Sequence, residues 1–177
     1  MTCRRSLRVS VVGSSGSGKT TFGKAIAARL GIPYVELDAI FHQPGWTELP
    51  DDEFRARVRD ATAGDRWVVD GNYDVVRPIV LERATTVAWL DYSRPRCMQQ
   101  VIRRSVSRGL GRGELWNGNR EDPRMWLRAS HPIRWSWTHH ARKRAEYEAR
   151  YREPQYSHLD VRRFRVPRDA RAWLESL

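Results

Sequence analysis

The sequence has little cysteine and no long hydrophobic run, and each shortage excludes a class of protein. Cys3 and Cys97 can form at most one disulfide, and without histidine they cannot complete a four-ligand zinc site. No stretch approaches the roughly 18 apolar residues that a membrane-spanning helix needs. The start of the chain also lacks the apolar core and cleavage site of a signal peptide. We therefore expect a cytoplasmic protein that makes no contact with a membrane.

Lysine is also scarce, although the chain is strongly basic. Apart from Lys19, Lys24 and Lys143, all of its 32 basic residues are arginines, and they outnumber 21 acidic residues to give a formal net charge of +11. Residues 1–90 hold 12 basic and 11 acidic side chains, so nearly all of the surplus lies in the second half. Such a surplus is either a solvated arginine-rich surface or a surface that binds phosphate on a nucleotide or a nucleic acid.

The 177 residues fit one compact domain, 1–177, and the order of the expected elements indicates its class. Short runs rich in β-branched residues alternate with stretches of helical spacing, which predicts an α/β fold with a mostly parallel sheet. Its ligand site would lie at the carboxyl ends of the strands. The expected strands lie at 9–12, 34–37, 67–69, 85–90 and within 157–166. Longer helices are expected after Ser93 and over 133–152.

The segment GSSGSGKT, from Gly13 to Thr20, has the P-loop pattern between an expected strand and an expected helix. Backbone N–H groups of such a loop surround phosphate oxygens, the Lys19 charge offsets theirs, and the Thr20 hydroxyl can coordinate Mg²⁺. The alternative is a flexible Gly/Ser connector with an incidental lysine. The residues predicted to bind ATP are Gly13, Ser14, Ser15, Gly16, Ser17, Gly18, Lys19, Thr20 and Thr21.

Beyond the P-loop, the chain resembles a known group of kinases. Asp38 after the second strand, Asp70-Gly71 after the third and the arginine-rich helix after Asp91 are similar to P-loop kinases such as adenylate kinase and shikimate kinase. VELDAIFHQPGW and WVVDGNY resemble, more narrowly, the bacterial adenylate-kinase-related proteins that are also labelled topology modulation proteins. The resemblance implies a three-layer P-loop NTPase fold of the nucleoside-monophosphate-kinase type. It also implies a five-stranded parallel sheet, an acceptor-binding region at about 38–66 and a mobile lid at about 109–130.

The same resemblance implies where phosphate and metal are held. Asp70 matches the aspartate that adenylate kinases place near Mg²⁺, and Asp91 is the alternative metal ligand. Arg104 falls where these kinases carry a phosphate-binding arginine, and Arg112 and Arg120 lie in the expected lid. Lys19, Asp38, Arg104, Arg112 and Arg120 are therefore the expected catalytic residues. Gln100 replaces an arginine that stacks on adenine, so the preference for ATP over GTP stays open.

The acceptor is expected between the second and third strands. A carboxylate at Asp38 can orient or deprotonate an acceptor hydroxyl, although it can also simply cap the strand. The predicted acceptor-site residues are Asp38, His42, Trp46, Arg55, Gly71, Asn72, Tyr73 and Arg77. Farther along, His139 and His140 lie beside basic residues on an expected helix, which favours a solvated face over a metal site.

These features predict a kinase that moves the γ-phosphate of MgATP to a small-molecule acceptor, with nucleotides and nucleosides among the candidates. The alternative function is that of a nucleic-acid-binding P-loop ATPase. In that protein the basic second half would bind the phosphate backbone while its tryptophans, Trp116, Trp126, Trp135 and Trp137, stack on bases. The sequence leaves the acceptor and the oligomeric state open.

Overall fold

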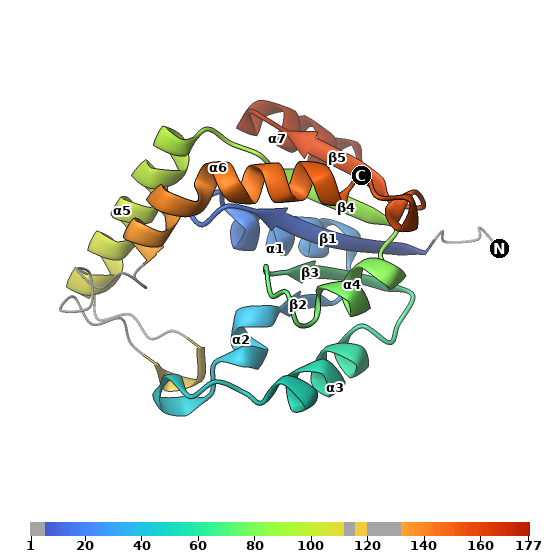
Figure 1. Ribbon diagram of the computed structural model, residues 1–177, viewed down its shortest axis with the longest axis horizontal. Coiled ribbons are helices and arrows are strands. Elements are labelled where there is room, and N and C mark those ends of the chain that lie inside the picture. Colours follow the sequence, from blue (N-terminus) through green and yellow to red (C-terminus); the bar gives the residue numbers. More distant parts are fainter. Residues whose placement is uncertain (1–5, 112–115, 120–131) are drawn as a thin grey trace.

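The structure, a computed structural model, describes residues 6–111, 116–119 and 132–177 (Figure 1). In these ranges the strands form a five-stranded parallel sheet in the order β2-β3-β1-β4-β5. The strands are β1 (Leu7–Gly13), β2 (Tyr34–Glu36), β3 (Arg66–Asp70), β4 (Thr86–Leu90) and β5 (Asp160–Phe164). The predicted α/β fold with a parallel sheet is therefore confirmed.

The helices lie on both faces of the sheet (Figure 1). They are α1 (Lys19–Leu30), α2 (Leu37–Phe41), α3 (Asp51–Ala61), α4 (Arg77–Arg83), α5 (Arg94–Gly111), α6 (Pro132–Arg150) and α7 (Pro167–Ser176). Short 3₁₀ turns are η1 (Pro44–Trp46), η2 (Trp116–Gly118) and η4 (Pro154–Tyr156). None of the helices in the described ranges is long and apolar enough to cross a bilayer.

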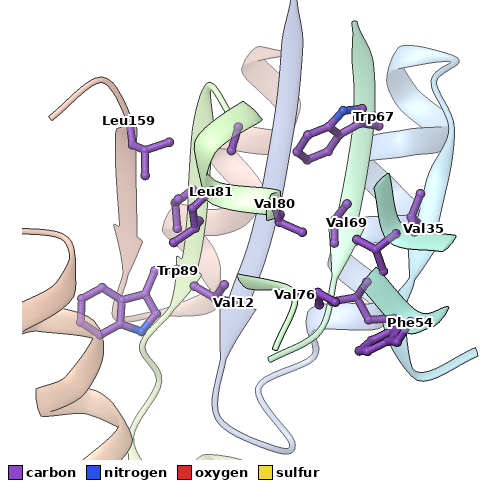
Figure 2. Close-up of a cluster of buried hydrophobic side chains, with 14 of the residues drawn as sticks. Val12, Val35, Phe54, Trp67, Val69, Val76, Val80, Leu81, Trp89 and Leu159 are labelled. Atoms are coloured by element: carbon purple, nitrogen blue, oxygen red, sulfur yellow. The ribbon is translucent and has the colours of Figure 1, made fainter. Parts of the chain in front are cut away.

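Two buried clusters make the three layers. Because neighbouring residues of a strand point to opposite faces, Val11 packs with α1 and α7 while Val12 packs with α3, α4 and α6. Figure 2 shows the cluster that contains Val12, in which Phe54 of α3 and Trp89 of β4 lie on either side of Val12. The central strand β1 is thus fixed from both faces.

Two local expectations were wrong. The second strand ends at Glu36 and not at Leu37, because its partner β3 ends at Asp70 in the same register, and Asp38 lies in the first turn of α2. His140 is not on a solvated face. It is 6% exposed, and its Nε2 lies 3.0 Å from the Tyr92 carbonyl oxygen, because this side of α6 packs against the chain after β4.

Asp91, directly after β4, ties α6 and β5 to the centre of the sheet. Its side chain is 3% exposed, and its Oδ2 accepts hydrogen bonds from Arg144 Nη2 at 2.7 Å and from Arg163 Nε at 2.9 Å. The Arg163 guanidinium also lies 4.2 Å from the Trp89 ring centre. Two arginines therefore neutralise this buried carboxylate. The sequence left Asp91 open as an alternative metal ligand, and the structure shows the arginines as its partners.

We expect Asp91→Ala to destabilise the fold by about 3 kcal/mol, because it leaves two arginines facing each other without their shared carboxylate. Both arginines reach solvent, which keeps the loss at the lower end of the range for broken buried pairs. Urea denaturation of the variant measures it. The matched control is Asp160→Ala, since Asp160 pairs with Arg162 at an exposed site and should change stability by less than about 1 kcal/mol. Equal losses in the two variants would contradict the assignment.

Candidate active site

The P-loop connects β1 to α1 and rests on helix α5. Gly16 has φ +77°, and a methyl group there would lie 2.3 Å from the Cys97 carbonyl oxygen, so only glycine fits both the backbone and the space. The Ser17 N–H donates to the Ser14 carbonyl at 3.1 Å, and Lys19 Nζ donates to the same carbonyl at 3.2 Å. The loop is thus wrapped around the N-terminus of α1, where phosphate is favoured.

Asp70 meets the P-loop at the position expected for a metal. Thr20 Oγ1 donates to Asp70 Oδ2 at 2.7 Å, and the Tyr34 hydroxyl donates to the same oxygen at 3.2 Å. Asp70 Oδ1 is buried with no hydrogen-bond partner in the described residues. Burial raises the pKa of the Asp70 carboxyl, and the Lys19 charge and the Thr20 bond oppose that rise.

The chemistry of this pair fits Mg²⁺. A hydroxyl and a carboxylate with a spare buried oxygen are hard ligands, and Mg²⁺ commonly takes only one or two protein ligands beside phosphates and water. No group of three or more His, Cys, Asp or Glu side chains suited to a metal occurs in the described ranges. Any metal held here would therefore depend on the nucleotide for most of its ligands.

A second carboxylate, Asp38, lies across the site from the P-loop. The Tyr73 hydroxyl donates to Asp38 Oδ1 at 2.6 Å and lies 3.3 Å from His42 Nε2. Burial and the Asp38 charge raise the pKa of Tyr73, so the phenol keeps its proton and stays a donor. The Asp38 charge also acts on Asp70, raising its pKa, so the two carboxylates share one electrostatic environment. The tertiary fold thus brings Lys19, Thr20, Asp38, Asp70 and Tyr73 together.

Comparison with known proteins gives this site a family. A family model described as shikimate kinase matches residues 15–47. The shikimate kinase of Symbiobacterium thermophilum is 33% identical over 138 residues, which cover 70% of this chain and 76% of the relative. That of Ruegeria pomeroyi is 31% identical over 159 residues, covering 86% and 73%. The chain belongs to the shikimate kinase family, within the adenylate-kinase-like group of P-loop kinases.

The fold agrees with this membership. A shikimate kinase crystal structure from Bacteroides thetaiotaomicron matches with a TM-score of 0.55 over 96% of this chain and 95% of that one, at 14% identity. The protein is an ATP-dependent small-molecule kinase, a phosphotransferase, and the nucleic-acid-binding alternative is not favoured. The predicted P-loop, kinase class and nucleoside-monophosphate-kinase-like fold are confirmed.

In this chain, which belongs to the shikimate kinase family, Gly71 and Asn72 contribute to the site in different ways. Gly71 has φ +146°, and a methyl group there would lie 2.6 Å from Leu37 Cβ, so the β3 end packs directly on α2. Asn72 Nδ2 donates to the Gly13 carbonyl at 2.7 Å. This bond holds the first P-loop glycine, and Asn72 Oδ1 has no hydrogen-bond partner among the described residues, so its predicted contact with the acceptor stays a prediction.

Three of the predicted arginines, Arg55, Arg77 and Arg104, lie on three different helices. Arg55, on α3, pairs with Asp52 at 2.8 Å on an exposed face. Arg77 pairs with Asp74 and lines a cavity of about 20 Å³ under the loop after β3, where burial lowers its pKa. Arg104 is half-buried on α5. Arg112 and Arg120 lie outside the described residues.

Sequence reasoning missed several residues that the site uses. Tyr34 is one, because nothing in a three-residue edge strand signals that its hydroxyl reaches Asp70. Asn117 and Asn119 are the others. Their amides bind the backbone of residues 39–46, within and after α2. The signal for them was a WNGN sequence within the glycine-rich stretch expected to be a lid.

Lys19→Ala should reduce phosphoryl transfer on the order of 100-fold or more while leaving the fold intact, because the variant loses the charge placed at the phosphates. Turnover and binding of a non-hydrolysable ATP analogue measure the effect. Lys24→Ala is the matched control, since Lys24 lies on the same helix and pairs with Glu36 at the surface. Normal turnover in folded Lys19→Ala protein would contradict the P-loop assignment.

Asp70→Asn should raise stability in the absence of nucleotide, and by more at pH 7 than near pH 3. Burial raises the pKa of Asp70 above its unfolded value, so the unsubstituted protein loses stability as pH rises through that interval, whereas asparagine does not titrate. Thermal unfolding in EDTA at several pH values measures the difference. A gain that is largest at low pH would show that Asp70 is stabilised as a carboxylate.

Proposed function

We propose that this kinase phosphorylates a hydroxyl group of a small molecule bound between α2, η1 and the Asp70–Tyr73 loop. The observation that carries the proposal is the Asp38 carboxylate, which accepts one bond from Tyr73 and retains further acceptor capacity. A carboxylate repels an acceptor phosphate but attracts the proton of an acceptor hydroxyl. Shikimate, the acceptor in the names of its relatives, is therefore the first compound to test.

Each residue would have a separate task. Lys19 and the P-loop N–H groups would hold the phosphates of ATP. Thr20 and Asp70 would hold Mg²⁺, which when bound offsets phosphate charge. Asp38 would orient the acceptor hydroxyl and take its proton as the oxygen attacks. Tyr73 keeps Asp38 in place, since the phenol donates to it and is itself buried.

We also propose that residues 38–66 form the acceptor-binding region and 109–130 the lid. In that arrangement Arg104, Arg112 and Arg120 would stabilise charge on the transferring phosphoryl group and help to exclude water. Aromatic rings support the acceptor assignment of the first region. Phe41 packs 4.7 Å from Tyr73, and Trp46, 42% exposed, packs 5.3 Å from His42, each between ring centres.

The acceptor is tested by incubating the protein with γ-labelled ATP and either shikimate, cytidine or cytidine monophosphate, followed by mass spectrometry. A mixed metabolite extract widens the search. We expect a product in which a hydroxyl has gained one phosphate. Transfer to the phosphate of cytidine monophosphate, with no hydroxyl compound modified, would overturn the proposal.

Asp38→Asn should lower transfer to the hydroxyl acceptor by roughly 10²- to 10⁴-fold, because asparagine can still accept the Tyr73 bond but cannot take a proton. Affinity for a non-hydrolysable ATP analogue should stay within about twofold, since the hydrogen-bond partners of Asp38 are Tyr73 and His42, which lie outside the P-loop. Asp60→Asn, an exposed carboxylate at the end of α3, is the control and should be unchanged. Retained transfer in Asp38→Asn would exclude proton abstraction by this residue.

A further inference from the structure

The segment 116–119 is bound to residues 39–46, which run from within α2 through η1. Asn117 Nδ2 donates to the carbonyls of Ala39 at 3.2 Å and His42 at 2.5 Å. Asn119 Nδ2 donates to the Gln43 carbonyl at 2.9 Å, and Asn119 Oδ1 accepts from the Trp46 N–H at 2.9 Å. We call residues 39–46 the acceptor loop. Two asparagine side chains thus satisfy four backbone groups of the acceptor loop, which lies more than 70 residues earlier in the sequence.

Burial and backbone geometry make this contact specific. Asn119 is 4% exposed, so its amide has little access to water as a substitute partner. Trp46 has φ +59°, in the left-handed region that side chains with a Cβ seldom adopt, and its N–H is the group that Asn119 binds. Trp116 adds a ring contact, stacked 5.9 Å from His42 with 25° between the planes.

The acceptor loop in turn carries the groups next to Asp38. The His42 N–H donates to the Asp38 carbonyl at 3.0 Å, and His42 Nε2 lies 3.3 Å from the Tyr73 hydroxyl that donates to Asp38. A shift of the loop would therefore change how His42 meets Tyr73. It would also change the environment of the Asp38 carboxylate.

We propose that Asn117 and Asn119 are positioning residues for the acceptor site, which clamp the acceptor loop and through it set the place of His42 beside Tyr73 and Asp38. That these residues act on acceptor binding rests on the proposed function. The hydrogen bonds that clamp the acceptor loop do not depend on it. It assigns a role to residues 116–119 that is separate from phosphate binding. The acceptor class is the one proposed above, a small molecule whose hydroxyl group faces Asp38.

The variants distinguish the effect of each side-chain amide from the effect of the local backbone conformation. Asn119→Ala removes both amide bonds, whereas Asn119→Asp keeps the acceptor for the Trp46 N–H and loses the donor for Gln43. Asn117→Gly removes the amide but tolerates the left-handed backbone at φ +54°. Gln155→Ala is the control, because it removes an exposed amide on η4 that pairs with Glu153.

The first measurement is amide hydrogen exchange without any ligand. We expect roughly tenfold faster exchange at Trp46 in Asn119→Ala, near-normal exchange there in Asn119→Asp, and no change in α7 or in the control. The second is the side-chain NMR spectrum of His42, assigned with His42→Gln. Its ring resonances should move in Asn119→Ala and Asn117→Gly but not in Gln155→Ala.

The kinetic measurement uses shikimate as its first probe, or another compound that the acceptor test shows to be phosphorylated. We expect the acceptor KM to rise about tenfold in Asn119→Ala while ATP-analogue affinity is unchanged. Unchanged exchange at Trp46 and unmoved His42 resonances in folded variants would overturn the clamp, whatever the acceptor test gives. Failure of every acceptor, with faster exchange and shifted His42 signals, would instead reject the proposed function and keep the clamp.

Discussion

The close packing of the P-loop against α5 is the constraint on which the site depends. Gly16 leaves no room for a side chain beside the Cys97 carbonyl, so the loop has one path from β1 into α1. That path begins at Gly13, whose carbonyl accepts from Asn72 after β3. The nucleotide loop is therefore fixed from the two elements that follow β3 and β4. The strands β3 and β4 are the neighbours of β1 in the sheet. The geometry of the site therefore depends on that strand order.

Three aspartates near the ends of strands show how surroundings decide the role of one side chain type. Asp91 is enclosed by two arginines and joins α6 and β5 to the sheet. Asp70 is as buried but meets a hydroxyl, a phenol and the lysine charge, and its Oδ1 has no hydrogen-bond partner among the described residues. The Asp38 carboxylate accepts a hydrogen bond from the Tyr73 phenol, which in turn lies beside His42. A neutralised carboxylate supports the fold, whereas the two less neutralised ones face the nucleotide loop and the proposed acceptor.

Membership in the shikimate kinase family narrows the chemistry to phosphoryl transfer between ATP and a small molecule. In that chemistry the protein mostly positions groups and offsets charge. The proposed acceptor side of this chain holds aromatic rings, a phenol and backbone groups bound by asparagine side chains. The basic surplus of the second half is partly used inside the fold, since Arg144 and Arg163 bind the buried Asp91 carboxylate.

The sequence by itself determined the P-loop, the alternation of strands and helices, and the kinase group. These depend on local signals, namely GSSGSGKT, β-branched runs and helical spacing, which act over a few residues and leave a pattern in one chain. It also pointed to Asp38 and Asp70, because residues at the carboxyl ends of parallel strands meet at one edge of a sheet. The predicted second strand was one residue too long, since the length of a strand depends on its partner.

Tertiary structure decided which partner each polar group meets. Asn72 binds Gly13 across 59 residues, and Asn119 binds Gln43 across 76. His140 is buried against Tyr92, although its neighbours in the sequence are charged. No local pattern encodes such pairs, because the free energy of a hydrogen bond depends on whether the fold excludes water from both partners. The family therefore follows from the sequence, while the clamped acceptor loop follows from the packing of distant segments.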